Sequence, residues 1–364
     1  MPENRSNNTA ADTVGLVQRI KQQKKQIDAL QQSSSWRLTS PLRWLSRVAR
    51  GLTNKAPAVS ALPPPVLKDY AAWVREFDSL SAEVSANLVA QIDGFAHLPL
   101  FSVLLPVDTA NIDELRATVD SVKQQLYPHW ELCIAIGTGA SADVHALLKT
   151  YAQEEPRIKI ATGHTNDMAL LSNQALTMVS DHSDWVISLS ATVNIVVQAM
   201  IVLAREANEH ENSQIIYTDE DVLELLGQRV QPNFKPDWNQ ELHYSRNLIG
   251  RSGIYRTALV QQVDGYQTGM AEAMDFDLSL RCLEHVAADQ IAHLPYVLFH
   301  GAPFAPSSQP ASDTGVQTLH AYFTRQHIDA RAENIGHGYR IHYALPKALP
   351  LVSLIIPTRN GLEL

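Results

Sequence analysis

From Leu98 onward, short apolar runs alternate with longer segments in which apolar residues recur at helical spacing. The apolar runs predict buried strands, and the helical spacing predicts amphipathic helices. Strands are expected at 101–106, 131–136, 157–160 and 185–189, and helices at 112–126, 143–152, 167–178 and 196–207. This regular alternation predicts an α/β fold with a parallel sheet covered on both faces, whose ligands lie at the carboxyl ends of the strands.

The region before the predicted sheet has a different pattern of apolar and polar residues. Leu16, Ile20, Ile27 and Leu30 lie at helical steps in a run rich in Gln and Lys. They predict an amphipathic helix of about two heptads, whereas a coiled coil is recognised over about three or four. Two interpretations stay open: a short coiled coil that makes a homo-oligomer, and a solvated helix.

Residues 34–50 (SSWRLTSPLRWLSRVAR) interleave two tryptophans and several aliphatic residues with four arginines. No acidic residue occurs between Asp28 and Asp69. Such a stretch suits an anionic membrane surface, where tryptophan lies at the headgroups and arginine meets phosphate. The alternative is a helix that packs on the main domain.

A stiff linker and a second helical pattern follow. Residues 56–65 contain four prolines, which favour an extended spacer, and residues 70–93 have helical spacing. The predicted organisation is therefore an N-terminal segment with its linker at 1–65 and a helical lead-in at 66–97.

One apolar strand pattern occurs twice. Residues 99–107 (PLFSVLLPV) return at 350–358 (PLVSLIIPT), each entered through a leucine. The repeat predicts that a first domain spans 98–346 and that 347–364 begins a second, similar domain as part of a tandem protein. The alternative is a chance likeness of two apolar strands.

Composition narrows the function classes. With 29 basic and 38 acidic residues, the net charge of −9 argues against a surface that binds nucleic acid. Cys133 and Cys282 are the two cysteines, too few for a disulfide framework or a four-cysteine zinc site. No apolar run approaches the roughly 18 residues of a membrane span, and the start lacks a signal peptide. We expect a cytoplasmic protein, peripheral on the inner face of the cytoplasmic membrane if residues 34–50 bind lipid.

Several motifs occur in a fixed order along the chain: 101–107 (FSVLLPV), 127–135 (YPHWELCIA), 216–221 (IYTDED), 234–239 (FKPDWN) and 274–281 (MDFDLSLR). Together they resemble the family 2 glycosyltransferases, most closely the tandem enzymes of O-antigen and surface-polysaccharide assembly. The leader motif at 35–39 (SWRLT) and the second-domain start at 355–361 (IIPTRNG) are also typical of that group. The resemblance covers roughly residues 98–346.

The resemblance implies a GT-A fold: a Rossmann-like, mixed and mostly parallel sheet flanked by helices, preceded here by the N-terminal helical region. It also implies a nucleotide-sugar donor, a divalent metal (Mg²⁺ or Mn²⁺), and inverting transfer to a glycan or lipid-linked glycan acceptor. The metal would neutralise the departing diphosphate, and a general base would take the proton of the acceptor hydroxyl.

The chain departs from the family at three donor-binding places. After the second strand the family has Asp-Asp and this chain has 136–139 (IGTG); before the third helix Asn-Gly-Gly is replaced by 165–167 (TND). After the fourth strand, where the family has an Asp-x-Asp-type motif, this chain has 190–193 (SATV). Hydroxyls and apolar groups bind Mg²⁺ and Mn²⁺ poorly, so the metal site is expected to be lost.

The acceptor half of the motifs is retained. Asp275 matches the family's general base at a helix start, and Asp277 follows it in the same motif. Helix capping is the alternative for this pair, since an acid at a helix N-terminus is favoured without catalysis.

The other candidates lie between the fifth strand and the last motif. Asp219, Glu220 and Asp221 resemble an acidic loop near the acceptor, or form a solvated charged turn. The acceptor scaffold would also include three residues of one motif, of which the tryptophan is a sugar platform or a core aromatic: Lys235, Asp237 and Trp238. His300 matches a histidine that can complete a metal site, although a lone histidine is more often structural, and no convincing metal ligand set remains.

Two functions follow from these residues. The chain is an enzyme that adds a sugar to a bacterial surface glycan, or its first domain is catalytically silent and binds the glycan or docks at the membrane. The missing carboxylates favour a silent first domain, with transfer carried out by the parent protein.

Overall fold

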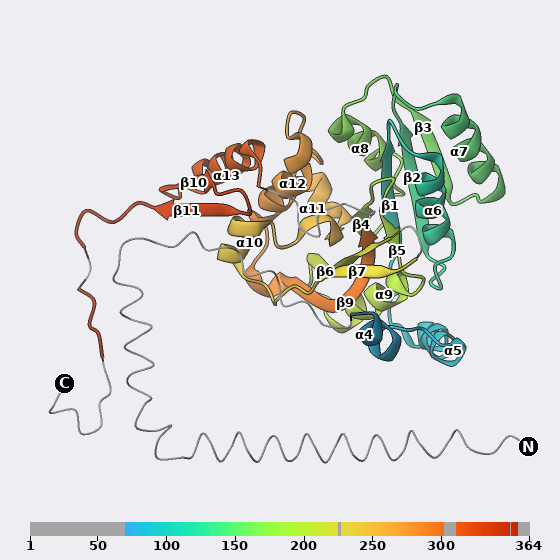
Figure 1. Cartoon of the computed structure of the whole chain (residues 1–364), viewed down its shortest axis with the longest axis horizontal. Coiled ribbons are helices and arrows are strands. Elements are labelled where there is room, and N and C mark those ends of the chain that lie inside the picture. The colour runs from blue at the N-terminus through green and yellow to red at the C-terminus, as the bar shows by residue number, and fades with distance from the viewer. Residues whose placement is uncertain (1–69, 225–226, 302–310, 350, 356–364) are drawn as a thin grey trace, which may run out of the picture. The chain divides into compact units, whose positions relative to one another are not determined.

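The computed structural model describes residues 70–224, 227–301, 311–349 and 351–355 (Figure 1). The chain divides into two compact units, Met1–Leu67 and Lys68–Leu364, and the described residues all belong to the second. The helices predicted at 16–30 and 34–50, the linker at 56–65 and most of the repeat motif at 355–361 lie outside the described residues, so these predictions stay predictions.

A parallel half-sheet carries the first four predicted strands. They are β1 (Phe101–Val107), β2 (Trp130–Ile136), β3 (Ile158–Thr162) and β4 (Trp185–Ser188), in the order β3-β2-β1-β4. Every residue of β1 and β2 is buried, as expected of strands covered on both faces. The predicted α/β class is confirmed.

The second half makes the sheet mixed. β8 (Gly253–Arg256) runs antiparallel between β4 and β6 (Ile215–Leu223), so β6 is parallel to β4. β9 (Ile291–Gly301) lies parallel to β6, while β7 (Arg229–Asn233) and β5 (Asn194–Ile195) pair antiparallel with β6 and β9. The carboxyl ends of β1, β2, β4 and β6 therefore share one edge of the sheet.

Helices cover both faces. The predicted helices are observed as α6 (Ile112–Lys123), α7 (Ala142–Glu154), α8 (Met168–Leu176) and α9 (Ala199–Glu209). Side chains of Asn111, Ser141 and Asp167 cap the first three by accepting amide hydrogen bonds. One hydrophobic core joins the sheet to α6, α7 and α9, and a second joins it to α8, α11 (Thr257–Gln262) and α12 (Met274–Leu283). Cys133 and Cys282 are buried in the second core.

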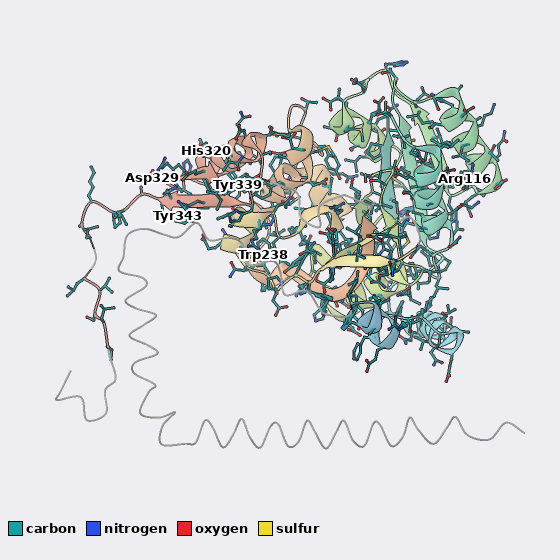
Figure 2. The ribbon with its side chains drawn as sticks, viewed as in Figure 1. Arg116, Trp238, His320, Asp329, Tyr339 and Tyr343 are labelled. Carbon is teal, nitrogen blue, oxygen red and sulfur yellow. The ribbon has the colours of Figure 1, made fainter. Side chains whose placement is uncertain are left out.

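A smaller layer extends the domain beyond the sheet. It consists of α10 (Gln240–Arg246), α12, α13 (Asp313–Arg325) and the hairpin of β10 (Ala330–Asn334) and β11 (Tyr339–Tyr343). Figure 2 labels Tyr339 and Tyr343 on β11. Tyr339 stacks on Phe276 of α12 with ring centroids 5.8 Å apart, which ties the hairpin to that helix. Short 3-10 turns complete the order: η1 (Ile92–Gly94), η2 (Gly250–Ser252), η3 (Ala271–Ala273) and η4 (Ala288–Gln290).

The predicted helical lead-in consists of two helices. α4 (Tyr70–Phe77) and α5 (Ala82–Gln91) are separate because the Ser81 side chain accepts from the amide of Val84 and starts a new helix. A serine that caps a helix competes with helical continuation, and a periodicity count does not detect this.

The second copy of the strand pattern is not a strand over residues 351–355. Leu351, Val352, Leu354 and Ile355 are 73–96% exposed, whereas every residue of β1 is buried. A strand needs a neighbour to satisfy its ladder, and the described residues offer it none. Among the described residues no helix combines the length and apolarity needed to cross a bilayer.

Candidate functional site

The space at the end of β2 is occupied by the carboxylate of the residue that follows β1. Asp108, the residue after β1, accepts a 2.6 Å hydrogen bond from the amide of Gly139 through Oδ1. A Cβ atom would lie 2.6 Å from this oxygen at Gly137 and 2.7 Å from it at Gly139. Only glycine therefore leaves room for Asp108 at these two positions. Asp108 was not predicted as a site residue, although an acid directly after the first strand lies at the edge of the sheet where ligands bind.

The end of β4 carries hydroxyls. Ser190 and Thr192 bond to each other with 3.1 Å between their hydroxyl oxygens. The Asp167 side chain caps α8, because its carboxylate accepts hydrogen bonds from the amides of Ala169 and Leu170 at 2.8 and 3.2 Å. A divalent cation would find neutral oxygens here rather than the anionic ones it prefers.

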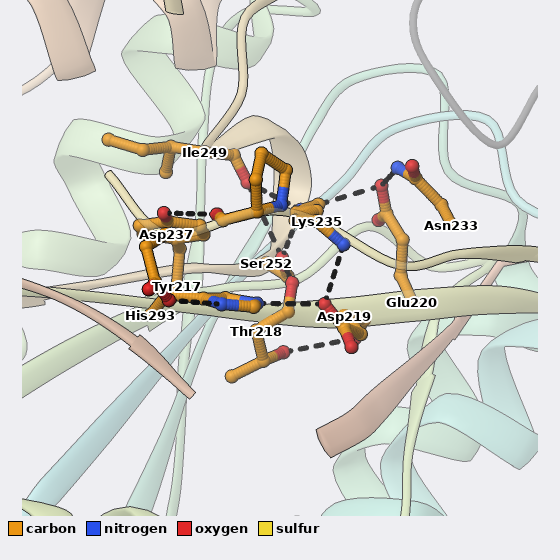
Figure 3. Close-up of polar contacts among 11 residues, drawn as sticks. Tyr217, Thr218, Asp219, Glu220, Asn233, Lys235, Asp237, Ile249, Ser252 and His293 are labelled. Carbon is orange, nitrogen blue, oxygen red and sulfur yellow. Dashed lines mark hydrogen bonds and ion pairs between the residues drawn. The ribbon is translucent and has the colours of Figure 1, made fainter. Parts of the chain in front are cut away.

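The acidic run 219–221 lies within β6 and not in a loop after a strand. All three side chains are buried, at 2–4% exposure, so the solvated-turn alternative is wrong. Buried carboxylates must be paired. Cations pair with Glu220 and Asp221, and Asp219 is held by a backbone amide and a histidine ring. Figure 3 shows the network around Asp219 and Glu220.

Asp219 and Glu220 point to different partners. Asp219 Oδ1 accepts from the amide of Lys235 and contacts His293 Nε2, both at 2.9 Å. Glu220 accepts from Asn233 at 3.0 Å and lies 3.2 Å from the Arg251 guanidinium. Both carboxylates are therefore held by groups of β7, η2, β9 and the β7–α10 connection.

Lys235 is a buried cation within the same network. Its ammonium donates to the Ile249 carbonyl at 2.9 Å and to the Ser252 hydroxyl at 2.7 Å, and lies 3.6 Å from Glu220 (Figure 3). Burial lowers the pKa of Lys235, opposed by Glu220 and Asp219. Its contacts fix the backbone that carries the rest of the motif.

Asp221 anchors the lead-in helix. It contacts His300 Nδ1 and accepts from Tyr70 of α4 at 2.7 Å and from Arg229 Nε at 2.6 Å. Arg229 also pairs with Asp78, 2.6 Å away. The proposed metal ligand His300 is thus paired with Asp221. Tyr70 and Asp78 were not predicted because they lie far from the motif in the chain, and Arg229, 8 positions from Asp221, lies between two motifs and belongs to neither.

Asp237 and Trp238 lie at the surface of this region. The Asp237 side chain is fully exposed, with Oδ1 3.4 Å from His293 Nδ1. Trp238 is half-buried, with its ring centroid 6.4 Å from that of Tyr217 and 5.2 Å from that of His243 (Figure 2). One face of the indole thus contributes to packing while part of it remains open.

Asp275 lies in the first turn of α12 and does not cap it: the cap residue is Ala273, and no side chain makes the capping bond. The residue as a whole is half-buried. Burial raises the pKa of Asp275 to about 6, with Glu220 adding to the rise and Arg251 opposing it. A carboxyl group that titrates near neutral pH is suited to general base chemistry.

Asp277 is placed differently. Its carboxylate is 1% exposed and pairs with Arg281 one turn later, at 2.8 Å to Nε and 2.7 Å to Nη2. The structure therefore brings Asp275 together with Glu220 and Arg251, and it holds Asp277 in a separate ion pair.

Among the described residues, one group of three metal-ligand types lies close enough to share an ion: Glu206, Glu209 and His210. It lies on α9, whose Asn208 contacts His97 ahead of β1 at the opposite end of the sheet. The strand ends described above hold no comparable group, and the carboxylates there are paired with cations, used as a cap or bonded to backbone.

Asp275→Asn is expected to raise stability above neutral pH. The native pKa of about 6 exceeds the unfolded value, so ionisation opposes folding and the penalty grows as pH rises from 4 through 6. The variant should gain on the order of 1–3 kcal/mol at pH 8 and less at pH 5 in urea titrations. Asp143→Asn, at an exposed first-turn acid of α7, is the control and should show no gain. A gain equal at both pH values would contradict the assignment.

This strand order, with its mixed sheet and acidic carboxyl edge, is the GT-A fold of nucleotide-sugar glycosyltransferases. The chain superimposes on the crystal structure of S. aureus TarS 1–349 in complex with UDP-GlcNAc with a TM-score of 0.50 and 16% identity, over 62% of this chain and 66% of that one. The predicted fold is confirmed.

Two curated relatives match almost the whole chain. An O-antigen biosynthesis protein, RfbC, of Myxococcus xanthus is 28% identical over 90% of this chain and 27% of its own length. The uncharacterized protein y4gI of Sinorhizobium fredii is 29% identical over 89% of this chain and 37% of its own length. The chain thus spans less than two fifths of either relative. No model of a known protein family matches it.

Proposed function

We propose that this chain is a GT-A module of surface-polysaccharide biosynthesis that binds a glycan acceptor and lacks the family's metal and nucleotide-sugar site. The observation that carries the proposal is the contrast between the two halves of the carboxyl edge. The ends of β2 and β4 present glycines and paired hydroxyls, whereas Asp275, a half-buried residue, places a carboxyl group within electrostatic range of Glu220 and Arg251. The likeness to an O-antigen biosynthesis protein supports the role of the parent protein.

The metal part of the proposal rests on donor chemistry. Ser190 and Thr192 stand where the resemblance places an Asp-x-Asp motif, and neutral hydroxyls are weak ligands for Mg²⁺ or Mn²⁺. His300 offers no alternative site, because its ring contacts Asp221, which Arg229 neutralises. The donor half would then be silent, and transfer would depend on another domain.

The wider organisation is part of the same proposal. Residues 34–50 would hold the protein at an anionic membrane surface, and the exposed pattern at 351–355 would pair as the first strand of a second, similar domain. Four bulky apolar side chains left open to water are typical of a segment that another element covers.

An active enzyme is the second candidate. It is favoured by Asp275, whose raised pKa suits a base, and by Asp108, which brings a carboxylate to the place where the family's second strand supplies one. In this mechanism Asp275 would accept the proton of an acceptor hydroxyl, and Asp108 would hold a donor group by hydrogen bonding.

Nucleotide titration separates the two. We expect the chain to give no saturable heat with UDP, dTDP or GDP, with or without Mn²⁺, at concentrations that detect a Kd of about 1 mM. TarS 1–349, whose structure with UDP is known, is the positive control. Metal-dependent binding of any one nucleotide would contradict the silent-donor proposal and support the enzyme; its loss in Asp108→Ala would identify the carboxylate involved.

A further inference from the structure

An aromatic patch lies beside β7, and apart from Tyr70 its rings have no role in the site described above. It consists of Tyr70, Trp73 and Phe77 on α4 together with Phe234 after β7. Trp73 is the centre, with its ring centroid 5.1 Å from that of Phe234, 5.6 Å from Tyr70 and 6.1 Å from Phe77. Tyr70 is buried, whereas Phe77 is 66% and Phe234 43% exposed.

The patch is built on a fixed support. Tyr70 is hydrogen-bonded to Asp221, and the Arg229 guanidinium lies 5.9 Å from the Tyr70 ring. α4 packs against β7, as Figure 1 shows, so the helix and the strand present their rings together. Mutually packed rings on a held helix need little further ordering to bind a ligand.

The patch is also continuous with the network around β6, through the two residues that flank Phe234. Phe234 stands between Asn233, which donates to Glu220, and Lys235, whose amide donates to Asp219. A ligand that covers the Phe234 ring therefore lies next to the residues that hold the two buried carboxylates of β6.

We propose that Trp73, Phe77 and Phe234 form a stacking platform for sugar rings of the acceptor glycan. Sugar rings present apolar C–H faces that pack on aromatic rings and hydroxyls that need polar neighbours. Exposed Glu76, three residues after Trp73, lies on the same face of α4 and supplies such a neighbour. This charge also disfavours burial of the patch in hydrocarbon, so a glycan fits better than a lipid bilayer.

The inference rests on the proposed function and names the surface that holds the glycan. The probe is O-polysaccharide freed of lipid, from the bacterium that makes the protein, cast into native gels for affinity electrophoresis. The double variant Phe77→Ala/Phe234→Ala should bind about tenfold more weakly than wild type, as expected for the loss of two ring contacts. Val84→Ala, which removes a 46% exposed apolar side chain from α5, is the matched control and should bind as wild type does.

The possible outcomes distinguish failure of the platform proposal from failure of the proposed function. Wild-type affinity in the double variant would overturn the platform and leave the proposed function standing. Absence of polysaccharide binding by the wild type would overturn the proposed function and the platform with it. Loss of binding to anionic vesicles by the double variant, with polysaccharide binding unchanged, would assign the patch to lipid and overturn the platform. Equal circular dichroism spectra and unfolding midpoints exclude misfolding, since Phe77 is mainly exposed.

Discussion

Replacing Arg229 with methionine is expected to lower the free energy of unfolding by about 3–5 kcal/mol. Arg229 is the shared cation of two buried carboxylates, with 2.6 Å to both Asp221 and Asp78. Methionine keeps most of the apolar stem but leaves these two charges facing each other at a place with little access to water. Removal of one partner of a buried ion pair costs more than the pair itself contributes, because the remaining charge is uncompensated.

The same variant should release α4 before the sheet unfolds. Asp78 follows the C-terminus of α4 and Asp221 accepts from Tyr70 at its start, so Arg229 holds both ends of the helix on β6 and β7. Hydrogen exchange of α4 amides should accelerate more than that of β1. Arg75→Met removes an exposed arginine from the same helix and should change stability by no more than about 0.5 kcal/mol. Equal stability of the two variants would show that the ion pairs of Arg229 contribute nothing to the free energy of unfolding.

The parallel half of the sheet could be predicted because its signals are local. β1 and β2 are mainly apolar runs, each with one polar residue, and these two residues, Ser102 and Glu131, bond to each other. The helices between strands keep their periodicity and begin at capping residues such as Asn111 and Ser141. A parallel strand covered on both faces is apolar over most of its length, so the pattern had few other interpretations.

The acidic strand could not be predicted for the opposite reason. A run of three acids is expected in a solvated turn unless each finds a buried partner. Arg229 is only 8 positions from Asp221, but Tyr70 lies 151 positions from Asp221 and His293 lies 74 positions from Asp219. Burial of the run therefore depends on partners that a short window along the sequence does not contain.

The candidate site was predictable in part. Asp275 was recognised by its motif, but its difference from Asp277 is set by the burial of its carboxyl group without a paired cation among the described residues and by the ion pair of Asp277 with Arg281. Asp108 was passed over because its meaning depends on Gly137 and Gly139, which leave the space that its carboxylate fills. In the sequence, Gly137 and Gly139 indicated only that the family's acidic pair is absent. The acid that occupies this place in the structure, Asp108, follows a neighbouring strand.

Asp277→Asn is expected to destabilise the protein by about 3 kcal/mol, in contrast to the gain expected of Asp275→Asn two residues earlier. Arg281, whose side chain is 7% exposed, pairs with Asp277 and donates to the Val263 carbonyl at the end of α11. Without the carboxylate a buried guanidinium is left uncompensated between two helices of the second core. Urea titrations at pH 8 should therefore shift the two midpoints in opposite directions.

The opposite signs separate a structural acid from a functional one. Asp143→Asn removes a first-turn acid that is exposed, so it measures the helix-dipole contribution alone, about 0.3–1 kcal/mol. If Asp277→Asn cost no more than this control, the ion pair with Arg281 would carry no net stability. A strongly destabilised Asp277 variant beside a stabilised Asp275 variant would instead show that one turn of α12 holds two acids for different purposes: Asp277 fixes the helix to α11, and Asp275 is kept at a cost in folding free energy, as is typical of residues retained for binding or catalysis.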